Sequence, residues 1–456
     1  MKVRIEIDLG QIFSQVYHLA AKFRIEHFLL IYLAMHMLQI AFPSDGSMIF
    51  DEAHYVPASV ATLQGIAANA EHPPLPKIIS AIGIALLGNN WFGWRFPQVI
   101  MQIAGLYLFY LVAKRLLGDP WALGATMLLG LDTVFFIHGG ALLLDMPAFL
   151  LGFGAIELYF RKHYWLSAAT MGLAFLAREM SIFLFLTLAV YHLASHRHAL
   201  KAGLKLGLKY TLIALLVFGS LLWMYDMQYQ PAAATSVTNY VNANIVMGPN
   251  GSAVTTIYST FQSVSKDVIW NPVQHVLFIA SYHGPQGLVI NEPYRAYQYA
   301  WNWISPIGIG PNSSIAPAVF DSPSYFRVDV EVASGSAVTH YIPIWYRAQA
   351  NPALWYGIWP ALIALAWALV RKKEKLNALF VTTGILSNYV PWLILSAAVR
   401  RIGFNYYMIY TLPFIALGVC FAWKQLPEKY GKIILFLNVF LGLLFFLWFF
   451  PVRPMP

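Results

Sequence analysis

Charged residues are scarce in this chain of 456 residues, at 11% of the composition, whereas a soluble domain usually carries about 25%. Hydrophobic residues make up 59%. Several windows of about 20 residues contain almost no charge, which is the length needed to cross the hydrocarbon layer of a membrane. Such segments form helices in a bilayer, because a helix satisfies its own backbone hydrogen bonds. The composition excludes a soluble globular protein and predicts an all-α polytopic membrane protein.

Cysteine is almost absent as well. Cys420 stands alone inside an apolar run, so an intrachain disulfide and a cysteine metal cluster are excluded. We expect no cleavable signal peptide, because residues 1–26 are polar and no small-residue cleavage site follows the first apolar run. Apolar residues within 12–23 recur near helical spacing. They predict a cytoplasmic amphipathic N-terminus over 1–26 that lies along the membrane surface.

Hydropathy predicts about eleven transmembrane helices. Their approximate ranges are 27–42, 96–116, 121–137, 140–160, 165–178, 180–194, 207–225, 353–370, 377–397, 403–423 and 433–451. With the N-terminus in the cytoplasm, most of the 29 Lys and Arg residues fall in short inner segments, as the positive-inside rule requires, and the C-terminus lies outside. This orientation accounts for the net charge of +9, so we expect no nucleic-acid partner.

Two long outer loops divide the chain. The predicted organisation is an N-terminal transmembrane module (27–225) containing the first outer loop (43–95), an extracytoplasmic loop domain (226–352) and a C-terminal transmembrane module (353–456). The apolar stretch 78–88 is too short to span, and we expect a re-entrant or interfacial helix. Residues 325–332 alternate like a half-buried strand, which predicts a small mixed insert on the outer face.

The first outer loop concentrates ionisable side chains in two short runs. The run Phe50-Asp-Glu-Ala-His-Tyr55 holds Asp51, Glu52 and His54, and the run Glu71-His-Pro-Pro-Leu-Pro-Lys77 holds Glu71, His72 and Lys77. Adjacent carboxylates beside a membrane segment do not help insertion, which favours a functional site. Two alternatives stay open: a solvated loop end, or a helix N-cap in which Asp51 binds free backbone N–H groups.

Further ionisable groups fall near the outer ends of predicted helices. Placing the carboxylates of Asp132 and Asp145 there costs free energy unless they face a cavity or a partner. Asp145 could instead make only a favourable contact with a helix dipole. Arg178 and the pair Arg400–Arg401 lie at the depth of lipid headgroups, where arginines either reach toward lipid or bind phosphate oxygens bidentately.

Carboxylates and cations on one outer face suit group transfer from a lipid-linked phosphate. A carboxylate takes the proton from an acceptor hydroxyl as the hydroxyl attacks, and cations stabilise the phosphate that leaves. No cofactor is required by these residues. A divalent metal is not indicated, although a carboxylate–imidazole site stays open.

Several motifs, in order along about residues 45–415, resemble the dolichyl-phosphate-mannose protein O-mannosyltransferases. These are membrane glycosyltransferases of the GT-C fold class, glycosyltransferase family 39. The matching segments are Phe50-Asp-Glu-Ala-His-Tyr55, His72-Pro-Pro-Leu-Pro-Lys77, Leu131-Asp132, Leu144-Asp145-Met146, Gly172-Leu-Ala-Phe-Leu-Ala-Arg178, Ala300-Trp-Asn-Trp-Ile-Ser-Pro306, Asn351-Pro-Ala-Leu-Trp-Tyr356 and Arg401-Ile-Gly-Phe-Asn-Tyr-Tyr407.

The resemblance implies a role for each matched residue. Asp51 corresponds to the proposed catalytic base, with Glu52 beside it. Arg178 and Arg401 correspond to candidates for the carrier phosphate. The remaining predicted donor-site residues are His54, Glu71, His72, Lys77, Asp132, Asp145, Arg400 and Tyr407. The family inverts the sugar anomer in one displacement and needs no metal.

The chain departs from the family pattern at three places. Glu71 directly precedes His72 where the family has Asp-x-His. Gly139-Gly140-Ala141 replaces a segment in which an Arg is expected. The last motif has Tyr-Tyr instead of Tyr-His-Tyr. The large loop is also too short for the accessory sugar-binding domain of eukaryotic members, so the resemblance is to a bacterial or archaeal type in a prokaryotic cell membrane.

Three functions follow from these observations. The first is transfer of mannose, or a related hexose, from a polyprenyl- or dolichyl-phosphate donor to Ser or Thr of exported proteins on the extracytoplasmic face. The second is a GT-C glycosyltransferase with a lipid acceptor, similar to aminoarabinose transferases. The third is a non-enzymatic transporter of lipid-linked sugars, which should show paired half-repeats that are not seen here.

Overall fold

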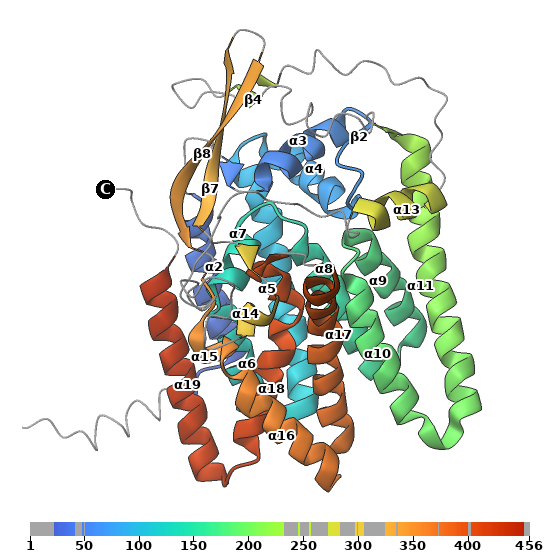
Figure 1. Cartoon of the computed structure of the whole chain (residues 1–456), viewed down its shortest axis with the longest axis vertical. Helices are drawn as coiled ribbons and strands as arrows, with labels where there is room; N and C mark the ends of the chain where they lie inside the picture. Colours follow the sequence, from blue (N-terminus) through green and yellow to red (C-terminus); the bar gives the residue numbers. More distant parts are fainter. Residues whose placement is uncertain are drawn as a thin grey trace, which may run out of the picture.

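Helices stand side by side as a bundle, and a cap containing α3, α4 and a β-hairpin covers one end (Figure 1). The computed structural model describes residues 22–41, 48–49, 51–231, 245–246, 255–256, 272–282, 297–298, 300–304, 324–333, 336–347, 349–372, 374–399 and 403–450. The predicted N-terminal segment 1–26 lies largely outside these residues.

The bundle is formed by segments from both halves of the chain. Its helices are α2 (Ile25–Ile40), α5 (Trp91–Leu117), α6 (Trp121–Gly130), α7 (Thr133–Gly140), α8 (Asp145–Phe160), α9 (Tyr164–Ala177), α10 (Ser181–Ser195), α11 (Leu200–Gln228), α15 (Pro352–Trp355), α16 (Ile358–Arg371), α17 (Lys375–Val399), α18 (Leu412–Lys424) and α19 (Glu428–Phe449). The 3-10 turns η1 (Arg197–Ala199) and η3 (Asn405–Tyr410) precede α11 and α18.

Among the described residues, five helical segments are long and apolar enough to cross a membrane, or six if the bent pair α6 and α7 counts as one span. The five are Trp91–Leu117, Arg197–Gln228, Pro352–Arg371, Lys375–Ala398 and Glu428–Phe449. The other expected spans coincide with shorter helices. The total of about eleven therefore stays a prediction. The expected span 403–423 is α-helical only over α18, because a strand over 403–404 and the 3-10 turn η3 precede that helix.

The predicted spans 121–137 and 140–160 have different boundaries in the structure. α6 and α7 are separate helices that meet at an angle of 68°. Asp132 causes the break, because its carboxylate accepts a hydrogen bond from Phe135 N over 3.0 Å and so caps a new helix. The next helix begins only at Asp145, after an irregular segment over 141–144.

Large apolar side chains cover the outside of the bundle. Leu208 on α11, Ile363 and Val370 on α16, and Trp448 on α19 are each more than two-thirds exposed. A protein surrounded by water would expose so many large apolar side chains only at great cost. These surfaces therefore face lipid, and the chain is an integral membrane protein.

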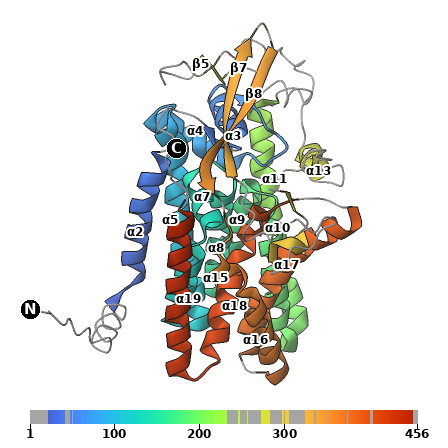
Figure 2. The same ribbon diagram turned by 60° about the vertical axis from the view of Figure 1, so that its left-hand side comes forward.

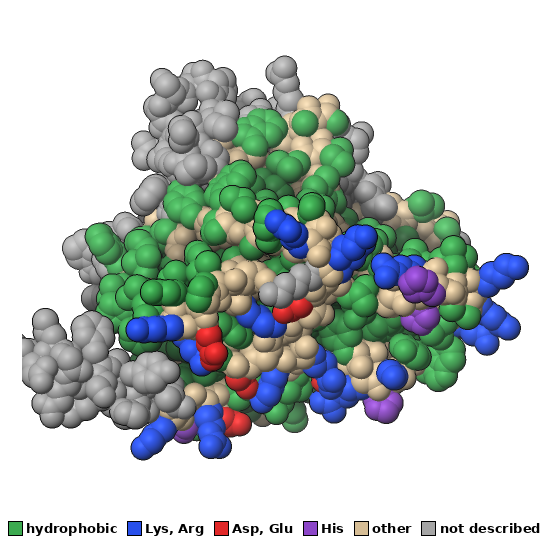
Figure 3. Space-filling model, turned by 90° about the horizontal axis from the view of Figure 1, so that it is seen from below, with side chains coloured by type: hydrophobic (Ala, Val, Ile, Leu, Met, Phe, Trp, Pro, Cys, Tyr) green, Lys and Arg blue, Asp and Glu red, His purple; other side chains and the backbone are tan. Residues whose placement is uncertain are grey.

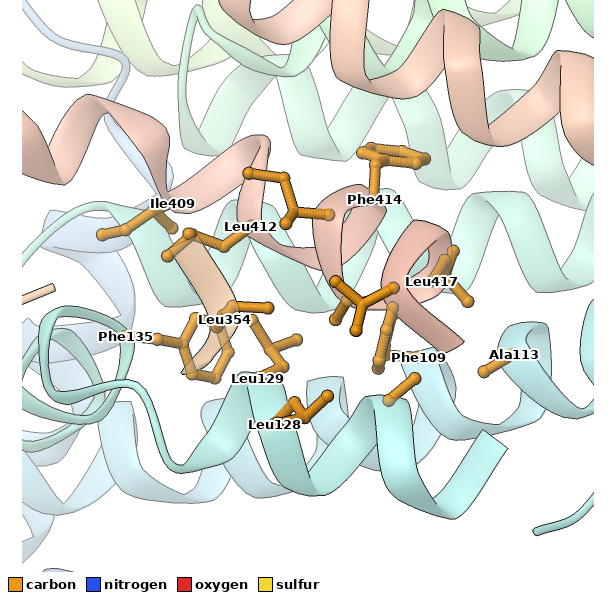
Figure 4. Packing of buried hydrophobic residues seen from close by; sticks show 14 of the residues in the cluster. Phe109, Ala113, Leu128, Leu129, Phe135, Leu354, Ile409, Leu412, Phe414 and Leu417 are labelled. Atoms are coloured by element: carbon orange, nitrogen blue, oxygen red, sulfur yellow. The ribbon is translucent and has the colours of Figure 1, made fainter. Parts of the chain in front are cut away.

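One hydrophobic core joins the N-terminal and C-terminal helices (Figure 4). Phe109 of α5 and Leu129 of α6 are buried in the same cluster as Leu354 of α15 and Phe414 of α18. Phe135 of α7 lies beside them. The two predicted transmembrane modules thus pack around a shared interior, which fixes the outer ends of their helices relative to one another.

The cap sits over the bundle end at which α7 ends and α8 begins (Figure 2). It contains α3 (Glu52–Leu63) and α4 (Leu75–Leu87), which includes most of the predicted stretch 78–88. The predicted strand 325–332 lies within β7 (Ser324–Ala333), which pairs antiparallel with β8 (Ser336–Arg347). β1 (Met48–Ile49) joins the other edge of β7 and carries the chain directly into α3.

Short contacts tie the large loop to the rest of the cap. β2 (Ile66–Ala67) pairs with β3 (Gln230–Pro231) at the end of α11, and β6 (Tyr297–Gln298) pairs with β9 (Gly403–Phe404) just before η3. β4 (Ile245–Val246) pairs with β5 (Thr255–Thr256). α13 (Pro272–Tyr282) and α14 (Ala300–Ile304) are further helices of this loop.

The opposite end of the bundle is strongly basic (Figure 3). Exposed Lys and Arg side chains stand at the turns between α5 and α6, α8 and α9, α10 and α11, α16 and α17, and α18 and α19. Several form ion pairs there, including Arg115 with Glu157 over 2.8 Å. The basic residues assigned to the cytoplasm thus gather at the end remote from the cap.

Candidate active site

Glu52, the first residue of α3, is fully buried and forms a bidentate ion pair with Arg95 of α5. The Nε and Nη2 groups of Arg95 donate to its two oxygens over 2.8 and 2.7 Å. The backbone N–H groups of Ile49 and Leu142 donate to the same oxygens over 2.8 and 2.9 Å. Glu52 therefore ties β1, α5 and the segment between α7 and α8 together. Both oxygens are occupied by these contacts, which favours a positioning role, and the catalytic role of Glu52 stays a prediction.

Asp51 differs from its neighbour, since its carboxylate is half-buried and makes no hydrogen bond among the described residues. Its backbone carbonyl accepts from His54 N and Tyr55 N over 2.9 and 3.1 Å and so starts the first turn of α3. The side chain does not cap the helix. The N-cap alternative is therefore wrong, and the carboxylate remains available for chemistry.

The surroundings of Asp51 bring opposing effects on its charge. Burial raises the pKa of Asp51 above its ordinary value, while the charges of His54, His72, Arg178 and His138 act in the other direction. The net shift is upward. A carboxylate with a raised pKa accepts a proton more readily, which suits a general base.

Asp145, Arg178 and His138 form a buried cluster where the ends of three helices meet. Nη1 of Arg178, which follows α9, donates to Oδ1 of Asp145 over 2.7 Å. Nδ1 of His138, near the end of α7, lies 2.8 Å from Oδ2. Asp145 therefore does more than interact with the dipole of α8, because its carboxylate contacts two specific side chains. His138 is therefore part of the cluster.

Glu179 extends this cluster toward the first outer loop. One of its carboxylate oxygens lies 3.8 Å from Nε of Arg178, and the other lies 3.8 Å from Nδ1 of His72. The ring of His72 also packs edge-on against Tyr55, with centroids 5.8 Å apart. The sequence reasoning missed Glu179, although its position directly after Arg178 was a usable signal.

Lys77 and Glu71 shape the loop that carries His72. Nζ of Lys77 is buried and donates to the carbonyls of Asn69 and His72, the latter over 2.8 Å. Burial lowers the pKa of Lys77 to about 8. Oε1 of Glu71 accepts from Nδ2 of Asn69 over 2.7 Å. Lys77 and Glu71 thus hold this loop in place, and their donor-binding roles stay predictions.

Asp132 lies outside the cluster and makes structural contacts, and its predicted donor-binding role stays a prediction. Besides capping α7, its carboxylate accepts from Asn351 N over 2.9 Å and from the indole N–H of Trp355 over 2.7 Å. Two motifs of the resemblance, Leu131-Asp132 and Asn351-Pro-Ala-Leu-Trp355, thus form one buried junction between the N-terminal and C-terminal helices.

A cavity of about 260 Å³ adjoins the Asp145–Arg178 pair. It is lined by Asp145, Arg178, Met180, Phe183, Asn388, Trp392, Tyr406, Tyr407 and Tyr410. The predicted residue Tyr407 therefore lies in the wall. Its ring stacks on Trp392 at 4.3 Å, and Tyr406 packs on His138 at 5.0 Å. Local sequence gave no indication of Asn388 or Trp392, because α17 contributes them from an apolar run.

Of the remaining predicted residues, one lies within the described part of the chain and two lie outside it. His54 is half-buried beside Asp51 and acts on it through its charge. Arg400 and Arg401 lie outside the described residues, so their roles stay predictions. Among the described residues, no group of three or more His, Cys, Asp or Glu side chains is arranged to hold a metal ion.

In a comparison with known sequences, residues 71–223 match a family model described as dolichyl-phosphate-mannose-protein mannosyltransferase. A polyprenol-phosphate-mannose--protein mannosyltransferase of Mycobacterium tuberculosis is 35% identical over 109 residues, which cover 22% of this chain and 21% of that protein. The corresponding protein of Mycolicibacterium smegmatis is 34% identical over 119 residues, covering 24% and 23%. The matches span less than a quarter of these relatives, and they confirm the resemblance recognised from the motifs.

Comparison with solved structures covers far more of the chain. The Saccharomyces cerevisiae protein O-mannosyltransferase Pmt1-Pmt2 complex bound to the sugar donor has a TM-score of 0.64 at 11% identity, covering 94% of this chain and 89% of that one. ArnT from Cupriavidus metallidurans bound to undecaprenyl phosphate has a TM-score of 0.51 at 14% identity, covering 89% and 62%. Such identities establish the fold alone, and the predicted GT-C architecture is confirmed.

Proposed function

We propose that this chain, a relative of the dolichyl-phosphate-mannose protein mannosyltransferases, transfers a mannose or related hexose from a polyprenyl-phosphate carrier to Ser or Thr hydroxyls of exported proteins. One observation carries the proposal: Asp51, a carboxylate without hydrogen bonds among the described residues, lies close enough to Arg178 for their charges to interact, and Arg178 lines a cavity. A base and a phosphate-binding cation are the groups that this reaction requires.

Arg178 is suited to bind the carrier phosphate. Asp145 occupies its Nη1 group, while Nε has no hydrogen-bond partner among the described residues. A guanidinium offers several N–H donors in a plane, so it can keep the ion pair with Asp145 and still donate to a phosphate oxygen. His138, on the other oxygen of Asp145, helps fix this carboxylate and through it the guanidinium.

The reaction then proceeds by one displacement. The acceptor hydroxyl oxygen attacks C1 of the sugar while Asp51 takes the hydroxyl proton. The bond between C1 and the phosphate oxygen breaks, and its electron pair stays on the phosphate, which Arg178 stabilises. Attack opposite the leaving phosphate inverts the anomer. This course uses side chains of the chain alone and draws on no metal.

We further propose that the cap and the cavity face the extracytoplasmic side, with the N-terminus in the cytoplasm. The basic turns at the opposite end support this orientation through the positive-inside rule. The module boundaries at 27–225, 226–352 and 353–456 remain part of the proposal, and the strand pairs of β2 with β3 and of β6 with β9 agree with a loop domain attached at both ends.

The test is transfer by the purified protein in lipid nanodiscs. Radiolabelled undecaprenyl-phosphate-mannose is supplied with a Ser- and Thr-rich peptide, and label is measured separately in peptide and in lipid. We expect label in the peptide, lost in Asp51→Asn and retained in Asp119→Asn, whose carboxylate pairs with Lys114 at the basic end. Label in lipid would favour the aminoarabinose-transferase-like alternative, and no hydrolysis or transfer at all would favour a transporter.

A further inference from the structure

Asn388 is a buried amide in the wall of the cavity with an unused hydrogen-bond acceptor. The residue lies in the middle of α17 and is 1% exposed. Its Nδ2 donates to the carbonyl of Gly384 over 2.8 Å. The reversed amide would place two acceptor oxygens against each other, so the carbonyl fixes which atom is which. Oδ1 is therefore the atom left without a partner among the described residues.

Two other polar groups of the same wall are also incompletely satisfied. Nε of Arg178 is buried without a hydrogen-bond partner among the described residues and lies 3.8 Å from the Glu179 carboxylate. The buried hydroxyl of Tyr410 lies near Asp145 without a well-formed hydrogen bond. Native proteins rarely leave buried polar groups unpaired, because each one costs stability. Three around one small cavity therefore indicate that a polar ligand completes them.

The types of these three groups restrict the ligand. Arg178 can only donate, Tyr410 can donate or accept, and Oδ1 of Asn388 can only accept. An ionised phosphate diester offers acceptors alone, so it can serve Arg178 and Tyr410 but leaves Asn388 unpaired. The ligand must therefore also carry an O–H or N–H donor, which the hydroxyls of a phosphosugar supply.

The lining of the cavity agrees with such a headgroup. Phe183 and the stacked rings of Trp392 and Tyr407 provide apolar surfaces for the C–H groups of a sugar.

We propose that Asn388 accepts a hydrogen bond from one hydroxyl of the donor sugar and selects donors by the presence of that hydroxyl. This inference rests on the proposed function, since it assigns the headgroup of the same donor. Asn388 is a specificity-determining residue and takes no part in proton transfer.

The test combines a side-chain deletion with deletions on the sugar. Undecaprenyl-phosphate-mannose and its mono-deoxy analogues are each assayed with the wild type, with Asn388→Leu and with Asn377→Leu. Asn377 lies on the same helix and donates to Leu116 O outside the cavity, so it is a matched control. In the wild type, one deoxy analogue should lose roughly 10- to 100-fold in kcat/KM.

Asn388→Leu should lose a similar factor with the complete donor and should then process that deoxy analogue no worse than the complete one. Asn377→Leu should keep the wild-type pattern. An equal penalty for every analogue in the wild type and in Asn388→Leu overturns the assignment. If Asn388→Leu does not fold, uniform tolerance of all deoxy analogues by the wild type overturns it equally.

Failure of the two proposals can be distinguished. If the wild type transfers no sugar from any polyprenyl-phosphate donor, the proposed function fails and the Asn388 assignment falls with it. If transfer occurs and no hydroxyl is coupled to Asn388, only the assignment of Asn388 fails.

Discussion

Replacing one carboxylate oxygen by an amide group should destabilise the protein at Glu52, whereas at Asp51 it should abolish transfer and leave stability unchanged. Glu52→Gln replaces a carboxylate oxygen by an amide NH2 group. Each oxygen of Glu52 accepts from one N–H of Arg95 and from one backbone N–H, so either orientation of the amide leaves two donors facing the NH2 group. Arg95, which is fully buried, also loses its counter-charge.

The expected cost follows from these contacts. Breaking a buried ion pair on one side costs about 3–5 kcal/mol in free energy of unfolding. Asp51→Asn, by contrast, removes no hydrogen bond among the described residues and should stay within about 0.5 kcal/mol of the wild type. The loss in Glu52→Gln should therefore exceed that in its neighbour several-fold.

Two measurements test this expectation. Thermal unfolding of both variants in detergent gives their Tm, and the transfer reaction is then assayed below the Tm of each variant. We expect Glu52→Gln to have a lowered Tm and Asp51→Asn to have a wild-type Tm without transfer. The reverse pattern, a stable and inactive Glu52→Gln beside an active Asp51→Asn, would show that Glu52 is the base and would refute the reasoning.

Other predictions concern the charges of the site and the junction of the helices. Because the base must be ionised, transfer should fall as the pH drops through the pKa of Asp51, and the raised pKa places this loss above the range of an ordinary aspartate; a pH profile in which the rate stays flat down to that ordinary range would contradict it. Arg178→Ala should raise the donor KM at least tenfold through the lost phosphate contact, with Arg178→Lys intermediate; an unchanged KM would remove the phosphate assignment. Asp132→Ala should lower the Tm through about 3 kcal/mol of lost buried hydrogen bonds while the donor KM stays constant; a KM change at constant Tm would support a donor-binding role. Arg401→Ala should weaken donor affinity in a direct binding assay, and equal affinity would exclude Arg401 from the phosphate site.

The sequence by itself determined the class of protein and much of the local structure. Long apolar runs with few charges fixed the membrane helices, and alternation predicted the strand that lies in β7. These signals are local, because hydropathy and period depend on neighbours within a single element. The ordered motifs also identified the family resemblance and directed attention to Asp51, Asp145 and Arg178.

Only the tertiary structure separated Asp51 from Glu52. Both are acids in one short run, and their sequence context is nearly the same. Glu52 meets Arg95, 43 residues away, and becomes an anchor, whereas Asp51 remains without a hydrogen bond among the described residues. The direction in which each side chain leaves α3 makes this difference, and packing against α5 fixes that direction.

The same reason explains why the sequence did not indicate the contacts of Asp132 or the position of Asn388. Asp132 finds its partners 219 and 223 residues along the chain, and Asn388 reaches the cavity from a helix that reads as an ordinary apolar span. Which polar groups are paired and which are left for a ligand depends on contacts between distant elements. Composition and spacing contain no record of those contacts, so only the packed helices decide them.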